Sequence, residues 1–336
     1  MKVSVISPCR NEANHIDAFL ECVLHQECRE LELEILVADG LSTDGTAQRL
    51  RGWSAKDGRI RVIRNPEGIV STGLNRAIAA ASGDVIVRMD IHTLYAPDYI
   101  WQCVQALKNT DAKCVGGPWF AEGKTAKQRA IANAFQSRFG SGGAASRRSD
   151  YSGPVDTVYL GAWWRNDLRQ IGGFDEELVR NQDDELCLRI TRSGGRIWQS
   201  AEIRSVYTPR DSLLALWRQF HQYGYWKALV LKKHRIPASP RHLMPFGFVA
   251  GMAALLALAP LSPFAGLAFA LLAGSYLLAA LFFAALANGN GGGTLLCTLA
   301  AFCAMHFGYG IGFGRGLFDF LLSGRGARPS MKNLTR

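Results

Sequence analysis

The longest stretch without a charged side chain divides this sequence into two parts. Residues 242–314 contain no Lys, Arg, Asp or Glu. Three apolar segments lie in or beside this stretch, at about 244–260, 264–287 and 294–322. A helix of about 20 apolar residues crosses a hydrocarbon core of about 30 Å, so we predict a transmembrane region of about three helices over residues 242–322.

The positive charge of the chain is concentrated on both sides of this region. Residues 1–191 hold 23 Lys and Arg against 25 Asp and Glu, whereas residues 192–241 hold 10 against 2, and a basic tail follows at 323–336. A nucleic-acid-binding protein usually spreads its basic residues over one face of the folded domain. Basic residues that flank an apolar region are instead typical of contact with anionic lipid headgroups. We therefore expect a membrane protein that does not bind nucleic acid.

A basic amphipathic helix is predicted before the apolar segments, within an interface region that covers residues 211–241. Apolar residues recur at helical spacing between Leu213 and Leu231, with Arg218 and Lys227 among them. Such a helix is suited to lie along a membrane surface. Three crossings would place the basic tail opposite the N-terminal half, against the positive-inside tendency, unless one segment is re-entrant or interfacial.

The cysteines indicate which side of the membrane the N-terminal half occupies. The eight cysteines form no C-x-x-C pair and no evident disulfide framework. Most of them lie in apolar periodic segments, as reduced core residues do. We therefore expect a multi-pass protein of the inner, cytoplasmic membrane whose N-terminal half faces the cytosol.

The first half of the sequence alternates strand and helix patterns. Short apolar runs of strand type occur at 3–6, 33–37, 60–63 and 85–89, and segments with helical spacing separate them. Strands separated by helices of this length form βαβ units and a mostly parallel sheet. The predicted fold class is therefore α/β.

Polar residues follow three of these strands, at Pro8–Glu12, at Asp39 and at Asp90–His92. In an open parallel sheet the ligand binds beyond the carboxyl ends of the strands, so the three clusters predict one binding site. Asp90 and His92 are two residues apart on a strand and point to the same side, where they can hold one divalent cation. The sequence lacks the glycine-rich fingerprints of dinucleotide-binding and P-loop proteins, which argues against dehydrogenases and P-loop NTPases.

Seven motifs, in this order, resemble those of the family 2 glycosyltransferases, which have the GT-A fold. They lie at 6–12 (ISPCRNE), 38–46 (ADGLSTDGT), 73–75 with 81–84 (GLN and ASGD), 90–92 (DIH), 161–165 (GAWWR), 171–175 (IGGFD) and 182–189 (QDDELCLR). The similarity covers about residues 1–230, and with the apolar C-terminal segments the chain looks most like membrane-bound exopolysaccharide transferases of the succinoglycan ExoA type. This resemblance implies a catalytic domain at 1–210, with a nucleotide-binding half at 1–92 and an acceptor half at 93–210.

The resemblance also implies how a nucleotide-sugar donor is held. Asp39 would accept a hydrogen bond from the imide N–H of a uracil-type base, so the expected donor is a UDP-sugar. Pro8, Arg10 and Glu12 would form the walls of the nucleotide pocket.

Asp90, together with a divalent metal ion (Mn²⁺ or Mg²⁺), would hold the diphosphate of the donor. The family usually has Asp where this chain has His92, and imidazole, which is softer than carboxylate, favours Mn²⁺ over Mg²⁺. The alternative for His92 is a hydrogen bond to a phosphate or to a loop carbonyl. Arg88 lies on the same strand face, where it either offsets the nearby negative charge or forms a structural ion pair.

Asp183 is the general base that the resemblance implies. Only the reading frame that starts at Asp183 places Leu186 three residues and Arg189 six residues further on, as the family motif requires, and Asp184 fails that test. Gln182 stands where the family has Glu, which removes one like charge and should leave the pKa of Asp183 lower than in a carboxylate pair. Deprotonation of an acceptor hydroxyl by this base gives a single in-line displacement with inversion.

Four further residues are implied on the acceptor and diphosphate side: Trp163, Trp164, Gln222 and Trp226. The last two lie in a segment that resembles the Q-x-x-R-W motif of processive synthases, with Tyr225 in place of Arg. Trp226 would stack on the acceptor sugar, and Gln222 would bond the diphosphate. Without the Arg, transfer of one sugar at a time is expected in place of processive polymerisation.

The expected function is that of an inverting, metal-dependent glycosyltransferase. It would move one sugar, a hexose such as glucose, from a UDP-sugar to a membrane-bound, lipid-linked oligosaccharide acceptor in exopolysaccharide synthesis. Two enzyme alternatives stay open: a polyprenyl-phosphate glycosyltransferase, whose phosphate acceptor needs no base, and a processive polysaccharide synthase. The alternative without catalysis is a membrane-anchored nucleotide-sugar sensor.

Overall fold

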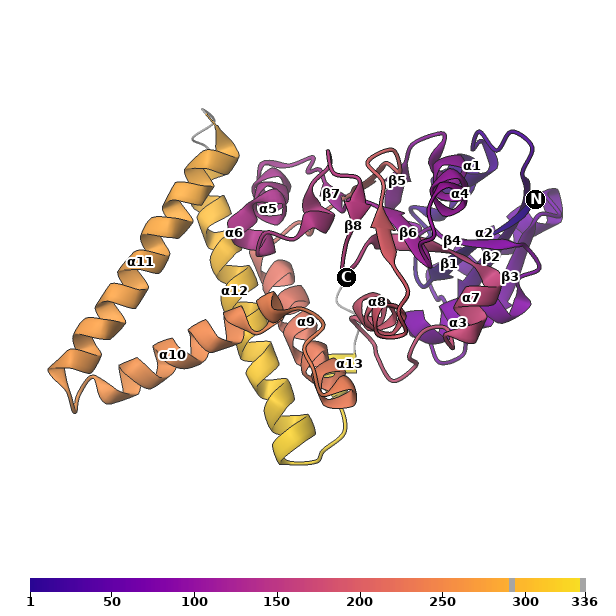
Figure 1. Cartoon of the computed structure of the whole chain (residues 1–336). Helices are drawn as coiled ribbons and strands as arrows, with labels where there is room; N and C mark the ends of the chain where they lie inside the picture. Colours follow the sequence, from indigo (N-terminus) through magenta and orange to yellow (C-terminus); the bar gives the residue numbers. More distant parts are fainter. Residues whose placement is uncertain (290–293, 333–336) are drawn as a thin grey trace. The chain divides into compact units, whose positions relative to one another are not determined.

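The computed structural model describes residues 1–289 and 294–332, which divide into two compact units (Figure 1). The first unit comprises residues 1–120 and 148–207, and the second comprises the remaining described residues. The sequence predicts one boundary near residue 210, whereas the packing assigns 121–147 to the second unit. The physical reason is that the buried apolar face of this segment packs on the C-terminal helices.

The first unit is an α/β domain. Its elements are β1 (Lys2–Cys9), α1 (Ile16–Leu24), β2 (Glu32–Asp39), α2 (Thr46–Lys56), β3 (Ile60–Arg64), α3 (Val70–Ala80), β4 (Val85–Arg88), β5 (Thr93–Tyr95), α4 (Tyr99–Asn109), β6 (Cys114–Gly117), β7 (Phe120–Ala121), β8 (Gly153–Pro154), β9 (Tyr159–Trp164), α7 (Arg165–Gln170), α8 (Gln182–Arg192), β10 (Ile197–Gln199) and β11 (Ser205–Tyr207). The main sheet has the strand order β3-β2-β1-β4-β9-β6-β10-β8. Strands β3, β2, β1 and β4 are parallel, and β9 runs antiparallel between β4 and β6. The predicted α/β class with a mostly parallel sheet is confirmed.

Alternating side chains of the parallel strands fill two hydrophobic cores, one on each face of the sheet. Val3 and Val5 pack with residues of α1 and α4, whereas Ile6 packs on the other face with residues of α3 and α8. Full burial of an aliphatic side chain of this kind stabilises a fold by about 1.5–3 kcal/mol. The strands are therefore held from both sides, as in other α/β sheets.

The strand register determines which residues meet at the carboxyl edge of the sheet. Cys9 of β1 pairs with Asp39 of β2, and Ile6 of β1 pairs with Arg88 of β4. The three strands therefore end close together, and the polar residues that follow them lie along one edge. In contrast, Trp164 of the antiparallel β9 pairs with Val85, the first residue of β4, at the other edge.

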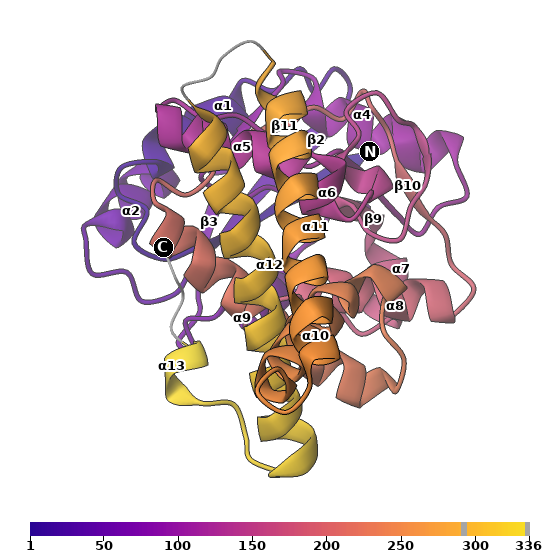
Figure 2. The ribbon, with the colours of Figure 1, turned by 90° about the vertical axis from the view of Figure 1, so that its left-hand side faces the viewer.

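The second unit is helical. Its elements are α5 (Ala126–Gln136), α6 (Arg138–Ser141), the 3₁₀ turns η1 (Ala145–Arg147) and η2 (Pro240–His242), α9 (Leu213–His234), α10 (Met244–Leu258), α11 (Pro263–Asn288), α12 (Leu295–Leu317), the π-helical turn η4 (Phe318–Leu322) and α13 (Pro329–Lys332). Three stretches in the described part are long and apolar enough to cross a membrane: Pro240–Leu258, Pro263–Asn288 and Leu295–Leu322. The predicted apolar helices are therefore present. Figure 2 shows α11 beside α12.

Glycines let α12 approach its neighbours closely. A Cβ atom on Gly308, Gly312 or Gly316 would lie within about 3 Å of a backbone carbonyl of α9, and one on Gly310 would meet a carbonyl of α10. Small residues spaced four apart allow helix backbones to pack in this way. These four glycines therefore serve helix packing.

Glu34 holds the amino edge of the main sheet together. Its buried carboxylate accepts hydrogen bonds from the Ser4 hydroxyl, the Ser82 amide (2.6 Å) and hydroxyl (2.9 Å), and the Gly83 amide (3.0 Å). Burial alone would raise the pKa of Glu34, but these hydrogen bonds lower it from 4.5 to about 2. The ionised form is therefore stabilised in the folded protein.

Replacement of Glu34 by Gln should lower the free energy of unfolding by about 3 kcal/mol at pH 7, the value of a pKa shift of this size. Because the folded pKa is depressed, this stabilisation is complete above pH 4.5 and is lost as the pH falls towards 2. Denaturant unfolding of both proteins at pH 7 and pH 3 tests the prediction. Glu32→Gln, at an exposed position of the same strand, is the control. A difference that does not shrink at pH 3 would contradict it.

Candidate active site

The loop after β2 places Asp39 at the carboxyl edge. An Asp39 carboxylate oxygen accepts a hydrogen bond from the Ser42 hydroxyl (2.6 Å). The Ser42 hydroxyl also accepts one from the Asn11 amide (2.8 Å), and the Asn11 side chain accepts one from the Thr43 amide (2.9 Å). These bonds join the loops that follow β1 and β2. Asp39 is half-buried at their junction.

Arg10 and Glu12 line the same junction, and Pro8 is half-buried near the end of β1. Arg10 is exposed, and its guanidinium donates to the carbonyl of Gly68 (3.3 Å). Gly68 has a φ of +67°, a conformation that favours glycine over residues with a side chain. Glu12 is buried, and its amide donates to the Thr46 hydroxyl (2.8 Å).

Arg88 joins two carboxylates that are far apart in the sequence. Its Nε and Nη2 atoms donate to the two carboxylate oxygens of Asp90, at 2.9 and 3.0 Å. Its Nη1 atom donates to Asp183, in the first turn of α8. The Arg88 side chain is 4% exposed. One buried guanidinium therefore fixes the strand end of β4 and the start of α8 together.

The charges around Asp183 act in opposite directions. Burial raises the pKa of Asp183, the carboxylates of Asp90 and Asp184 raise it further, and the guanidinium of Arg88 lowers it. The pKa of Arg88 is in turn raised by the two carboxylates, although burial opposes this. The net effect is a pKa of Asp183 above the ordinary value for an aspartate.

The start of α8 is held in place by two side chains. The Asn75 side chain donates to the Phe174 carbonyl (2.8 Å) and accepts from the Phe174 amide (2.8 Å). Arg189, further along α8, donates to the carbonyls of Ile171 and Gly173 and forms an ion pair with Glu185. The loop before α8 is thereby fixed to α3 and to α8 itself.

His92 lies beside Glu12 and not beside Arg88. Its Nδ1 atom is 3.7 Å from a carboxylate oxygen of Glu12. On the other side, the His92 ring meets the edge of Tyr207 at a centroid distance of 6.4 Å. In the described part of the chain, no group of three or more His, Cys, Asp or Glu is arranged to hold a metal ion.

An aromatic cluster that the sequence analysis missed adjoins His92. Trp119 stacks on Tyr159 with a centroid distance of 5.5 Å, and both contact Tyr207 edge-on. The Tyr159 hydroxyl is 2.8 Å from that of Thr93. Trp119 is only half-buried and follows β6 directly. Its position two residues after a buried strand is the only sequence signal of this cluster.

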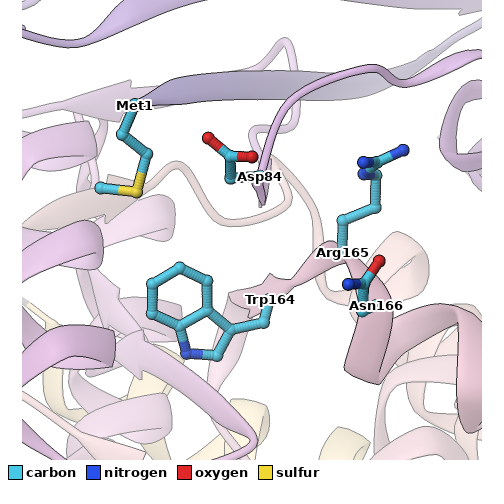
Figure 3. A pocket seen from close by; sticks show the side chains of 5 residues that line it. All are labelled: Met1, Asp84, Trp164, Arg165 and Asn166. Carbon is cyan, nitrogen blue, oxygen red and sulfur yellow. The ribbon is translucent and has the colours of Figure 1, made fainter.

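The structure does not bring Trp163 or Trp164 to this site. Trp163 is 2% exposed and packs edge-on against Phe174 in the core. Trp164 lines a pocket at the opposite edge of the sheet, together with four residues that Figure 3 displays: Met1, Asp84, Arg165 and Asn166. The reason is the antiparallel direction of β9, which carries Trp164 away from the ends of β1, β2 and β4.

Gln222 and Trp226 are buried inside the second unit. Trp226 is 1% exposed, and its indole N–H donates to the carbonyl of Met331 (3.0 Å). Gln222 is 3% exposed. The Trp226 ring also contacts Tyr225 and Phe320, so its faces are covered by protein. In this structure Trp226 offers no surface on which a sugar could stack.

Comparison with known proteins places this site in a family. The model of "Glycosyl transferase family 2" matches residues 4–168. The chain is 32% identical to "Succinoglycan biosynthesis protein ExoA" of Rhizobium meliloti (strain 1021), over 94% of this chain and 95% of that protein. It is 26% identical to a dolichyl N-acetyl-alpha-D-glucosaminyl phosphate 3-beta-D-2,3-diacetamido-2,3-dideoxy-beta-D-glucuronosyltransferase of Methanococcus voltae, over 74% and 78% of the two chains.

A solved structure shares the fold. It is the mannosyltransferase PcManGT from Pyrobaculum calidifontis in complex with GDP-Man and Mn²⁺, with a TM-score of 0.60 and 22% identity over 91% of this chain and 86% of that one. This chain belongs to glycosyl transferase family 2, has the GT-A fold and is a glycosyltransferase.

Proposed function

We propose that this glycosyltransferase moves one sugar from a nucleotide diphosphate to a lipid-linked oligosaccharide during exopolysaccharide synthesis. The observation that carries the proposal is the pair of carboxylates, Asp90 and Asp183, held on one buried guanidinium at the same sheet edge as the Asp39 loop. Different residues at the carboxyl edge of the sheet would then bind the diphosphate, take the proton of the acceptor and recognise the nucleotide base. The similarity to a succinoglycan biosynthesis protein along nearly the whole chain supports exopolysaccharide synthesis as the setting.

Asp39 is the proposed acceptor for the nucleotide base, with Pro8, Arg10 and Glu12 around it. Its carboxylate now accepts from Ser42, and a base N–H would take a place beside that hydroxyl or replace it. A carboxylate accepts from the imide of uracil and also from the N–H groups of guanine. We favour UDP as the carrier, and because PcManGT was solved with GDP-Man, the experiment below includes both bases.

Asp90 is the proposed protein ligand of a divalent cation. Both carboxylate oxygens of Asp90 now accept from Arg88, and the same oxygens can bind a cation in its place. Magnesium is usually held by one or two carboxylates, substrate phosphates and water, without a cage of protein ligands. When bound, such an ion offsets the charge that develops on the leaving diphosphate. The distance from His92 to Glu12 is short enough for both to contribute to the same pocket.

Asp183 is the proposed general base. Its carboxylate would accept the proton of the acceptor hydroxyl while the acceptor oxygen bonds to the anomeric carbon and the bond to the diphosphate breaks. This single displacement inverts the anomeric configuration. Arg88 keeps the ionised carboxylate in one orientation, and burial raises its pKa towards the working pH.

The aromatic cluster of Trp119, Tyr159 and Tyr207 is the proposed platform for the acceptor sugar. The rings of Trp119 and Tyr159 are half-buried in this cluster, and Tyr207 joins them to His92. Trp163, Trp164 and Trp226 are not proposed for this role, since two of them are buried and the third lies at the other edge.

We further propose that the protein sits in the inner, cytoplasmic membrane with its catalytic unit in the cytosol. All eight cysteines are free, as expected for a reduced compartment. The apolar helices of the second unit supply the membrane anchor.

A polyprenyl-phosphate acceptor is the second candidate, because relatives include a dolichol-phosphate mannosyltransferase of Pyrococcus furiosus, 32% identical over 37% of this chain.

The full chain in membranes that contain lipid-linked glycans should consume one nucleotide sugar and release its nucleoside diphosphate. A panel of UDP- and GDP-hexoses, each with Mn²⁺, Mg²⁺ or EDTA, tests this with nucleotide release and product mass as readouts. We expect turnover with a UDP-hexose and a metal, and a product one sugar longer than the acceptor. Long products would instead indicate a processive synthase. No consumption of any donor would contradict the proposal.

Asp183→Asn should reduce transfer by about 10³-fold or more and leave donor affinity within about threefold, because the amide cannot accept the proton. Transfer rates and calorimetric donor binding measure the two effects. Asp184→Asn, at the next position of the same helix, is the matched control and should retain most activity. Full activity of Asp183→Asn would favour a phosphate acceptor, which needs no base.

A further inference from the structure

The hydrogen bonds of Arg88 fix the relative placement of two carboxylates in addition to balancing their charge. Three of its nitrogen atoms bond two carboxylates, with the Nε and Nη2 edge on Asp90 and Nη1 on Asp183. The guanidinium is planar and always charged, so the relative placement of its donors is fixed. An ammonium group lacks this fork and cannot hold two carboxylates in a fixed relative orientation.

The position of Arg88 also gives it a role before the donor arrives. Asp90 and Asp183 lie on different elements, β4 and α8, and would repel each other without a cation between them. Both oxygens of Asp90, the proposed ligand of the metal, accept from Arg88. The donor-free site therefore already contains one positive charge at the place where the diphosphate and its cation are proposed to bind.

We propose that Arg88 is a positioning residue of the transfer reaction, which sets Asp183 at a fixed place relative to Asp90 and stands in for the cation beside Asp90 until the donor binds. This inference rests on the proposed function of Asp90 and Asp183. Donor binding then exchanges one partner of Asp90 for another, while the contact of Arg88 with Asp183 keeps the base in place for the acceptor.

Two substitutions test this proposal. Arg88→Lys keeps one charge and loses the fork, so kcat should fall by about tenfold or more while the KM for the donor changes less than about threefold. Arg88→Gln removes the charge, so the donor-free protein should bind Mn²⁺ at least about tenfold more tightly, measured by calorimetry without nucleotide. Glu34→Gln, a destabilised variant at the opposite edge, controls for loss of stability and should change neither value.

The two substitutions test the positioning role and the stand-in role of Arg88 separately. Equal kcat values for Arg88→Lys and the unaltered protein would overturn the positioning role, and unchanged or weaker Mn²⁺ binding by Arg88→Gln would overturn the stand-in role. The Mn²⁺ measurement needs no turnover, so it remains readable if no donor is consumed. Turnover by the unaltered protein together with a fully active Arg88→Lys would leave the proposed function intact and refute only this inference.

The C-terminal segment 318–332 is bound to α9 by side-chain hydrogen bonds. The Arg328 guanidinium donates to both carboxylate oxygens of Asp319, at 2.5 and 2.7 Å. The Tyr225 hydroxyl donates to Asp319 (3.0 Å) and accepts from the Arg328 amide (3.2 Å), and the Trp226 indole donates to Met331. Asp319 is fully buried in this cluster. The segment 318–332 therefore lies on the same side of any membrane as α9.

Helix α9 cannot lie across a bilayer from the catalytic unit. Only five residues, 208–212, separate the end of β11 from the start of α9, and they include Arg210 and Asp211. Five extended residues reach about 18 Å, which is less than the hydrocarbon thickness of about 30 Å. Helix α9 is also absent from the described stretches that are apolar enough to cross.

Helix α12 is packed inside the second unit to a greater extent than α10 and α11. Its glycines lie against α9, and Thr298 near its start donates to a carbonyl of α5. In the most apolar 18-residue segment of each helix, 44% of α12 is buried, compared with 11% of α11 and none of α10. Figure 1 shows α10 and α11 diverging from α12, and their exposed side chains, such as Phe264, Leu271 and Phe282, are apolar.

We infer that only α10 and α11 cross the membrane, as a hairpin, and that α12 and the basic tail remain on the catalytic side. An even number of crossings follows from the contacts of the tail with α9. It also satisfies the tendency of basic residues to stay in the cytosol.

Short epitope tags on the full chain test this inference: one at each terminus and one between Pro260 and Pro263. In inverted inner-membrane vesicles, both terminal tags should be open to protease and the hairpin tag protected. A protected C-terminal tag, or an accessible hairpin tag, would overturn the inference. Asp319→Asn, which weakens the cluster, should make the tail more sensitive to trypsin and leave the side of the C-terminal tag unchanged.

Discussion

The catalytic unit depends on the burial of one guanidinium between two carboxylates. Moving a charge out of water costs several kcal/mol, and only partners with good geometry repay it. Arg88 is 4% exposed, so its contacts with Asp90 and Asp183 are a condition of the fold as well as of the site. The same contacts connect two distant parts of the chain, because β4 ends at Arg88 and α8 begins at Gln182.

The sequence predicts the carboxyl edge well, because strand ends follow from local patterns. Apolar runs that stop at Pro8, Asp39 and Asp90 require only that neighbouring strands be parallel, and the register confirms that they end together. The reading frame of the motif at 182–189 selects Asp183. The link from Arg88 to Asp183 spans 95 residues and depends on how α8 docks, which no local pattern encodes.

The tryptophans illustrate the limit of such patterns. Two adjacent tryptophans on a strand point to opposite faces, so Trp163 enters the core and Trp164 does not. Whether the strand carries Trp164 towards the site or away from it depends on the direction of β9, and β9 is antiparallel.

Hydropathy has a similar limit in the second unit. It detects α12 as an apolar stretch, but only the packing of its glycines on α9 distinguishes a helix buried in protein from one that faces lipid.

The charges at the carboxyl edge of the sheet explain the two departures from the family pattern, His92 and Gln182. A further carboxylate at either position would add negative charge near Asp90 and Asp183, which share one buried cation. His92 instead faces Glu12, and Glu185 has its own partner in Arg189. Each of these carboxylates has a basic group beside it before any ligand is bound. On the function we propose, binding of the donor exchanges ionic partners and does not fill an uncompensated charge, so we expect the affinity for the donor to depend on how easily Asp90 leaves Arg88.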